Sequence, residues 1–233
     1  MNKFLALLEH FIFPQNCPVC GRLGASYCDK CLESVTEKQP PFCSACGGWW
    51  SEAKCEGAFP CYAASLYEGG AKEFLLKFKY KNCRALGLPM GRLLAGLFES
   101  CEADAIIPIP LHNESSRAYN QSLLLAQGIS EIIKIPVQDS LFWTKNFGRQ
   151  VEKRARERLS LPISAINCKP LSGESFLLVD DVYTTGSTIR AASEAIHRVG
   201  GRVCGAYFWC RAARRGSTKE FEDISDVLTL EIS

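Results

Sequence analysis

The sequence predicts an α/β protein in which a parallel sheet flanked by helices follows a small cysteine-rich, zinc-binding module. Apolar strand-like runs alternate with helix-like segments between positions 62 and 211, as in a parallel sheet with crossover helices. Eight of the thirteen cysteines lie between Cys17 and Cys61, and paired cysteines are typical of metal sites. We expect three regions: an N-terminal helix and zinc-binding module at 1–61, the α/β domain at 62–211, and an acidic C-terminal tail at 212–233.

Composition and charge favour a soluble, cytoplasmic protein. No apolar run is long enough to span a bilayer, and segment 1–13 lacks a small-residue cleavage site. We expect a short helix there, packed on the protein or docked on a membrane surface. The net charge of +2 does not by itself indicate nucleic-acid binding. Charge is uneven along the chain, however, because segments 72–84 and 145–158 are basic and 217–233 is acidic.

The cysteine module contains two knuckle-like turns, Cys-Pro-Val-Cys-Gly at 17–21 and Cys-Ser-Ala-Cys-Gly at 43–47. The glycine after the second cysteine permits the tight backbone that directs both sulfurs at one ion. Two further cysteines follow each knuckle, so two structural, tetrahedral zinc sites explain all eight. The predicted ligands are Cys17, Cys20, Cys28 and Cys31 in the first site and Cys43, Cys46, Cys55 and Cys61 in the second.

Other assignments of these cysteines stay open. Five residues rather than two separate Cys55 from Cys61, and an interleaved pairing of the cysteine pairs is possible, as are unliganded or redox-active thiols. Metal is the better interpretation, because so short a segment has too little core to fold alone and metal binding supplies the missing free energy. The remaining cysteines show no metal spacing and are expected to be core or surface thiols: Cys83, Cys101, Cys168, Cys204 and Cys210.

Periodicity places the elements of the α/β domain. Short, nearly continuous apolar runs predict buried parallel strands, and apolar positions three and four residues apart predict helices. The predicted strands are 62–67, 105–109, 176–179 and 203–209. The predicted helices are 71–80, 86–99, 118–134 and 187–199.

The segment with the most specific chemistry follows the strand at 176–179. Asp180 and Asp181 come at its end, where ligands bind in open α/β sheets. The next turn is built from small and hydroxylated residues and opens a helix, so its amides and hydroxyls can surround a phosphate. The carboxylates are suited to accept hydrogen bonds from ribose hydroxyls. A phosphorylated ribose is therefore the predicted ligand, with its phosphate held by Thr184, Thr185, Gly186, Ser187 and Thr188.

This segment resembles the 5-phosphoribosyl pyrophosphate signature of type I phosphoribosyltransferases along its whole length. The resemblance implies that fold, and it implies that the loop carrying Arg117 contacts pyrophosphate. It also implies that segment 145–158 closes over the substrate, with Gln150, Arg154 and Arg158 as candidate substrate contacts. A solvent-exposed basic helix is an equally good interpretation of this segment. The nearby His112 is more typical of an ordinary loop histidine.

The order of motifs resembles the ComF family of amidophosphoribosyltransferase-like proteins over roughly residues 1–210. Cysteine knuckles precede Leu-Lys-Phe-Lys-Tyr at 76–80, Pro-Ile-Pro-Leu at 108–111 and Arg-Ala-Tyr-Asn-Gln at 117–121. The resemblance implies a role in natural transformation, in handling incoming single-stranded DNA. Two positions depart from the family pattern: Ala118 replaces a glycine, and Leu161 replaces an asparagine, so no ligand contact is carried over to it.

Two functions of different classes follow. The first is a protein that binds phosphoribosyl pyrophosphate together with Mg²⁺, either as a ligand-binding domain or as a transferase, and in which Asp180 and Asp181 act on the ribose. The second is a single-stranded DNA-binding or adaptor protein that acts with DNA-uptake proteins and whose phosphoribosyl site is not catalytic. In the second, aromatic side chains within the basic segments would stack on bases, unless they belong to the core: Phe74, Phe78, Tyr80 and Phe147. A purine-salvage enzyme is a weaker third hypothesis, because no separate segment of the sequence indicates recognition of a nucleobase.

Overall fold

The computed structural model describes residues 16–97, 102–112, 115, 117–144 and 161–212. Several sequence predictions lie outside these residues: the N-terminal helix, the basic segment at 145–158, the acidic tail, and the side chains of Cys101, Phe147, Gln150, Arg154 and Arg158. No helix within the described ranges is long and apolar enough to cross a membrane.

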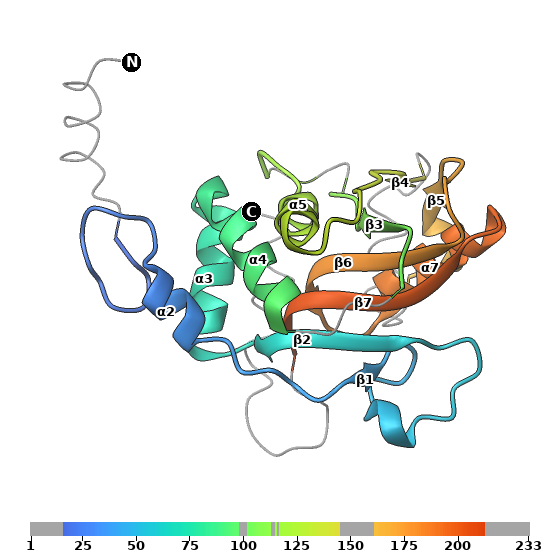
Figure 1. Cartoon of the computed structure of the whole chain (residues 1–233), viewed down its shortest axis with the longest axis horizontal. Coiled ribbons are helices and arrows are strands. Elements are labelled where there is room, and N and C mark those ends of the chain that lie inside the picture. The colour runs from blue at the N-terminus through green and yellow to red at the C-terminus, as the bar shows by residue number, and fades with distance from the viewer. Residues whose placement is uncertain (1–15, 98–101, 113–114, 116, 145–160, 213–233) are drawn as a thin grey trace.

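The centre of the molecule is a five-stranded sheet in the order β1-β2-β7-β6-β3 (Figure 1). Four neighbouring strands run parallel, and β1 pairs antiparallel with β2 at one edge. Their bounds are β1 Phe42–Cys43, β2 Pro60–Leu66, β7 Arg202–Arg211, β6 Ser175–Tyr183 and β3 Ala105–Pro108. This arrangement confirms the predicted α/β fold with a parallel sheet.

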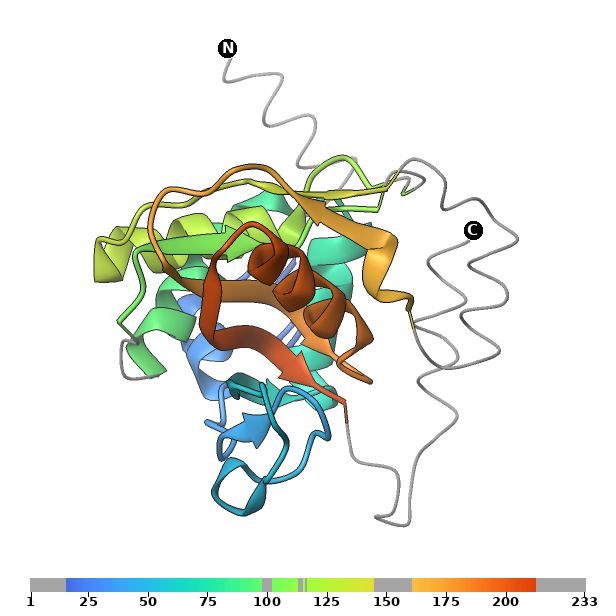
Figure 2. The same ribbon diagram turned by 90° about the vertical axis from the view of Figure 1, so that its right-hand side faces the viewer.

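Helices cover both faces of the sheet. One face packs against three helices through side chains such as Phe74, Met90 and Leu125. The other face packs against a single helix through Ile189 and Ile196, and it also contacts a small two-stranded sheet. Figure 2 shows that single helix in front of the sheet, with the other three behind it. The three helices are α3 Gly69–Tyr80, α4 Gly87–Leu97 and α5 Gln121–Ile133; the single helix is α7 Ser187–Arg198, and the small sheet pairs β4 Leu141–Trp143 with β5 Ile166–Cys168.

Two element boundaries differ from the prediction in ways that matter for the site. Strand β6 continues beyond 176–179, because its pairing with β7 extends through Asp180 and Tyr183, so the acid pair lies inside the strand. Helix α5 begins only at Gln121, because the side chain of Asn120 accepts hydrogen bonds from the next amides and caps the helix. As a result, Asp180 and Asp181 lie among the last four residues of β6, and Arg117 lies in the loop before α5.

The cysteine-rich region is joined to the main sheet. Strand β1 lies within this region and pairs with β2, so the expected boundary at residue 61 falls inside β2. Its short helix α2, Asp29–Ser34, packs against α3, whereas β1 and the 3₁₀ turn η1, Trp50–Glu52, lie along the β2 edge (Figure 1). Two further 3₁₀ turns, η2 Arg84–Leu86 and η3 Ile163–Ala165, complete the described elements.

Candidate functional site

The acid pair of β6 meets polar side chains from two helices. Asp180 Oδ1 accepts hydrogen bonds from the Ser122 hydroxyl at 2.8 Å and from the Asp181 amide at 2.9 Å. Asp181 Oδ1 lies 3.0 Å from Lys79 Nζ, and its Oδ2 lies 3.8 Å from Arg117 Nη1. The structure therefore brings three predicted site residues together, namely the two acids and Arg117.

Burial changes the acidity of the first carboxyl. The pKa of Asp180 is raised from 3.8 to about 7, first because burial disfavours the charged form and second because Asp181 is negatively charged. The hydrogen bonds from Ser122 and from the Asp181 amide act in the opposite direction. The pair can thus hold one proton near neutral pH, which sequence spacing does not reveal.

Lys79 and Ser122 contribute to the site although the sequence did not predict them, and Lys79 carries the charge. Its side chain is 6% exposed and that of Asp181 is 9% exposed, so the two form a buried ion pair. One signal was present in the sequence: Lys79 follows Leu75 by four residues, which places it on the apolar face of α3. A lysine on that face needs an acidic partner, and β6 supplies it.

Arg117 is held in place by its own loop. Its Nε donates to Ser115 Oγ at 3.0 Å, and its Nη1 donates to Gln121 Oε1 at 3.1 Å. The neighbouring Asn120 donates from its amide to the Ile109 carbonyl at 3.0 Å, which ties this loop to the end of β3. The guanidinium is therefore oriented toward Asp181 before any ligand arrives.

The turn after β6 provides the second half of the site. Thr184 and Thr185 are exposed, while Ser187 and Thr188 are half-buried in the first turn of α7. Gly186 adopts φ 74° as the N-cap residue and offers no side chain to cap the helix. The Thr185 and Ser187 hydroxyls lie 3.0 Å apart. Amides at a helix N-terminus bordered by hydroxyls form an arrangement that suits a phosphate.

This turn rests on the second cysteine knuckle. A Cβ atom on Gly186 would lie 2.7 Å from both the Ser44 carbonyl oxygen and Tyr183 Oη, so only glycine fits. The Tyr183 hydroxyl donates toward the Cys43 and Ser44 carbonyls at 3.4 and 3.3 Å. The Arg211 guanidinium donates to the Gly47 carbonyl. Backbone groups of the knuckle thus position the turn.

The cysteines form two clusters. In the first, the sulfurs of all four predicted ligands, Cys17, Cys20, Cys28 and Cys31, lie within 4.8 Å of one another. In the second, three sulfurs meet this criterion, those of Cys43, Cys46 and Cys55. Thiolates at such distances fit Zn²⁺, which proteins bind tetrahedrally through sulfur, so the clusters support structural zinc.

The fourth predicted ligand of the second cluster needs correction. Cys61 is directly opposite Phe42 in the β1–β2 pair, whereas Cys43 is opposite Pro60. Residues opposite each other share a face of the sheet and successive residues alternate, so Cys61 points away from Cys43. It packs with Phe42 in the apolar core and is fully buried. Burial raises the pKa of the Cys61 thiol, as expected for a core cysteine.

Several other predicted features are placed by the structure. Phe74 and Phe78 are fully buried. The prediction that they stack on bases is therefore wrong, and the alternative that they belong to the core is confirmed. Tyr80 is half-buried. His112 packs on the Trp143 ring with centroids 4.8 Å apart. The other described cysteines lie outside the two clusters, with Cys83 and Cys210 buried and Cys168 and Cys204 partly buried.

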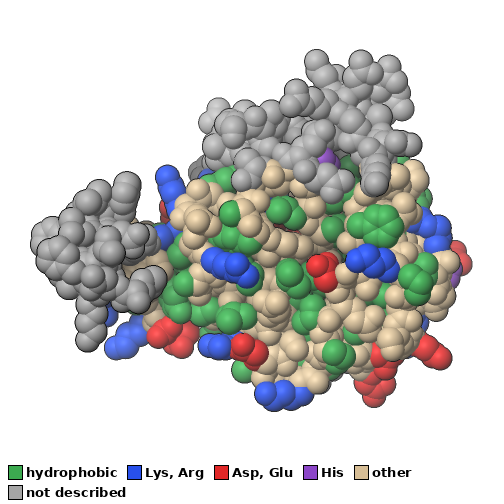
Figure 3. Space-filling model, turned by 90° about the horizontal axis from the view of Figure 1, so that it is seen from above, with side chains coloured by type: hydrophobic (Ala, Val, Ile, Leu, Met, Phe, Trp, Pro, Cys, Tyr) green, Lys and Arg blue, Asp and Glu red, His purple; other side chains and the backbone are tan. Residues whose placement is uncertain are grey.

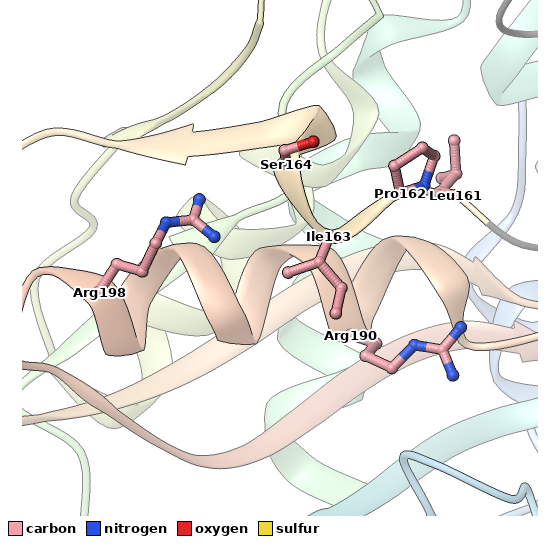
Figure 4. A pocket seen from close by; sticks show the side chains of 6 residues that line it. All are labelled: Leu161, Pro162, Ile163, Ser164, Arg190 and Arg198. Atoms are coloured by element: carbon pink, nitrogen blue, oxygen red, sulfur yellow. The ribbon is translucent and has the colours of Figure 1, made fainter.

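A shallow groove of about 610 Å³ lies between η3 and the outer face of α7 (Figure 4). Ile163 lies over the helix, between Arg190 and Arg198. Arg198 donates to the Ile166 carbonyl at 2.8 Å. The other lining residues are Leu161, Pro162 and Ser164.

On the face shown in Figure 3, the described Lys and Arg side chains alternate with Asp and Glu and do not gather into one basic surface.

Comparison with known proteins gives relatives for both parts of the chain. A family model described as a double zinc ribbon domain matches residues 8–64. Competence protein F of Haemophilus influenzae is 25% identical over 197 residues, which cover 74% of this chain and 85% of that protein. Competence protein ComFC of Bacillus subtilis is 27% identical over 135 residues, which cover 56% of this chain and 55% of that protein.

Similarity to adenine phosphoribosyltransferases is found over a shorter stretch of sequence or at lower identity. Adenine phosphoribosyltransferase of Corynebacterium jeikeium is 46% identical over 46 residues, which cover 20% of this chain and 22% of that enzyme. Among solved structures, adenine phosphoribosyltransferase from Leishmania donovani is 12% identical with a TM-score of 0.36, covering 66% of this chain and 80% of that chain.

Proposed function

Because this chain is a ComF-type protein with a double zinc ribbon at its N-terminus, we propose that it binds 5-phosphoribosyl pyrophosphate or a related ribose phosphate at the end of β6. One observation carries the proposal: a hydroxyl-rich turn with a glycine N-cap directly follows β6, two residues after an acid pair near the carboxyl end of that strand. Open α/β sheets bind ligands at this edge.

The phosphate part of the ligand would occupy the turn. The first amides of α7 have no side-chain cap from Gly186, and the helix dipole favours a negative group there. Hydroxyls of Thr184, Thr185 and Ser187 would complete the contacts, with Thr188 in the first helical turn. Such charge-assisted hydrogen bonds are shorter and stronger than neutral ones.

The ribose and pyrophosphate would occupy the space before the acid pair. Asp180 and Asp181 would accept hydrogen bonds from the ribose hydroxyls, and Arg117 would contact pyrophosphate, together with Arg158 from outside the described residues. Carboxylate and phosphate oxygens are the donors that Mg²⁺ prefers, so the donor set fits magnesium bound together with the ligand. Mg²⁺ would supply neutralisation of charge on the pyrophosphate.

If the protein is a transferase, the reaction is displacement at C1 of the ribose. The C1–oxygen bond to pyrophosphate breaks, its electron pair leaves with pyrophosphate, and C1 forms a bond to the acceptor. Asp180 and Asp181 would hold the sugar while positive charge develops on its ring, and Arg117 would stabilise the leaving group. Because Asp180 has a pKa of about 7, it could also hold a proton near neutral pH.

Calorimetry with 5-phosphoribosyl pyrophosphate and Mg²⁺ tests the binding proposal. The double variant Asp180→Asn, Asp181→Asn should bind at least ~10-fold more weakly, because hydrogen bonds to charged groups contribute about 1.5–3 kcal/mol each. The matched control removes two exposed acids elsewhere, through Glu131→Gln and Asp139→Asn, and should keep wild-type affinity. Absence of binding to the wild type would refute the proposal.

The similarity to competence proteins extends the proposal to the handling of incoming single-stranded DNA, with DNA-uptake proteins as partners. Burial of Phe74 and Phe78 means that any contact with DNA would depend on other side chains. Titration with a single-stranded oligonucleotide at several salt concentrations tests this, because contacts to phosphates give an affinity that falls steeply with salt. Salt-independent or undetectable binding would leave the protein with the small-molecule role alone.

A further inference from the structure

The two cysteine clusters are built on the same kind of knuckle. In the first, the Gly21 amide donates to the Cys17 carbonyl at 2.9 Å, and Gly21 has φ 70°. In the second, the Gly47 amide donates to the Cys43 carbonyl at 2.9 Å, and Gly47 has φ 64°. Each knuckle therefore presents two sulfurs with the same backbone geometry.

The second arms of the clusters differ at one position. In the first cluster, the arm begins at Cys28 and its other ligand is Cys31, three residues later. In the second, the arm begins at Cys55, and the residue three positions later is Ala58. The chain turns back at this point, since the Ala58 amide donates to the Cys55 carbonyl at 3.3 Å. Ala58 thus stands where the first cluster has its fourth thiolate.

No other described residue fills that place. Among the His, Cys, Asp and Glu side chains in the described ranges, none joins Cys43, Cys46 and Cys55 within 4.8 Å. The nearest cysteine in sequence, Cys61, points to the other face of the β1–β2 pair. Cys46 and Cys55 are exposed, so solvent reaches the side of the cluster that faces away from the core.

We propose that the second cluster binds a zinc ion through three thiolates, from Cys43, Cys46 and Cys55, and that the fourth position beside Ala58 takes an external thiol. Zinc sites with three protein ligands keep a fourth position for water or for an incoming ligand. A thiolate is the donor class that fits, because a zinc ion held by sulfur prefers soft ligands. Three thiolates on Zn²⁺ carry a net charge of −1, and a fourth completes the same ligand set as in the first cluster.

Cobalt substitution tests this on the full chain, because cobalt(II) gives thiolate charge-transfer absorption that grows with each thiolate bound. The wild type should bind about two ions per chain through seven cysteines. Addition of 2-mercaptoethanol should then raise the absorption, saturably, by about one seventh as an eighth thiolate joins. Ala58→Cys should show the higher absorption without added thiol and should no longer respond to it. A wild type that does not respond to thiol overturns the proposal.

Two further measurements distinguish the origin of the fourth ligand. Cys61→Ala should retain both ions and the same response to thiol; loss of one ion would show that Cys61 is a ligand and would overturn the proposal. In competition with a coloured chelator, one ion should leave the wild type at least ~10-fold faster than the other, whereas Ala58→Cys should hold both, since a fourth thiolate closes the site. Equal release of both ions from the wild type would contradict an open position. None of these readouts depends on ribose phosphate binding.

Discussion

The two cysteine clusters pack against different parts of the α/β domain. The first packs on the helical face, where Cys17 and Leu32 join the core that contains Phe74 and Phe78. A Cβ atom on Gly70, at the start of α3, would lie 2.5 Å from Val35, so this contact is close. The second cluster instead supports the turn after β6 through its knuckle carbonyls. Two similar local motifs therefore have different roles: the first cluster stabilises the helices on one face of the sheet, and the second positions the candidate ligand site.

Removing one ligand from each cluster should separate these roles most strongly. Cys28→Ser should lose one metal ion and at least ~3 kcal/mol of unfolding free energy, because structural zinc contributes on the order of 10 kcal/mol to folding. Cys46→Ser should cost less stability but weaken ribose phosphate binding. Metal analysis, urea unfolding and calorimetry measure these effects. Cys168→Ser, outside both clusters, is the control, and equal stability losses at Cys28 and Cys46 would remove the distinction.

Lys79 lies in α3, the helix that packs against the first cluster, and its ion pair with Asp181 links this helix to the acid pair. Lys79→Met leaves Asp181 buried without this partner and should reduce stability by about 3–5 kcal/mol. Adding Asp181→Asn should restore a large part of the loss, because the uncompensated charge is then gone. A double-mutant cycle from urea unfolding measures the coupling between the two residues. Additive effects of the two substitutions would mean that the ion pair does not stabilise the fold.

Gly186→Ala tests whether the second knuckle shapes the turn. A methyl group there meets the Ser44 carbonyl at 2.7 Å, and a positive φ costs a non-glycine residue about 1–2 kcal/mol. The variant should lose roughly 2–3 kcal/mol of stability and bind ribose phosphate more weakly. Gly200→Ala is the matched control: its φ is 88° and no atom lies within 4 Å of the added Cβ. If both variants lose the same stability and affinity, the knuckle does not constrain the turn.

Asp180 should make stability depend on pH. Its pKa is raised in the folded protein to about 7, so the folded state binds more protons than the unfolded chain between about pH 4 and 7. This contribution is fully present below the unfolded pKa and is lost as pH rises through 7. Urea unfolding across pH 4–8 should show stability declining over this range, and Asp180→Asn should flatten the slope. An unchanged slope would show that Asp180 does not titrate there.

Tyr183→Phe should have the smallest effect. The hydroxyl makes long hydrogen bonds, at 3.4 and 3.3 Å, to the knuckle carbonyls, and its loss should cost at most ~1 kcal/mol. The ring still packs on Phe42, with centroids 4.7 Å apart, so the contact between turn and knuckle should persist. Thermal unfolding measures the stability change. A loss comparable to that of Gly186→Ala would show that the hydroxyl, and not the close backbone contact, holds the turn.

Much of the fold could be predicted from periodicity. The strands and helices of the α/β domain appear close to their expected positions, because buried strands and amphipathic helices leave long apolar patterns. The small β4–β5 sheet was missed, since strands of three residues are too short to show alternation. The acid pair was expected after β6 and not within it, because polar residues at a strand end resemble the start of a loop.

The sequence by itself determined the local chemistry: two knuckles, an acid pair and a hydroxyl-rich turn, each set by residues a few positions apart. Tertiary structure alone decided which groups meet. Tyr183 reaches Ser44 across 139 positions, Lys79 pairs with Asp181, and Cys61 turns into the core. Such contacts depend on how strands and helices pack, and the spacing of residues along a chain carries no record of distances across a sheet.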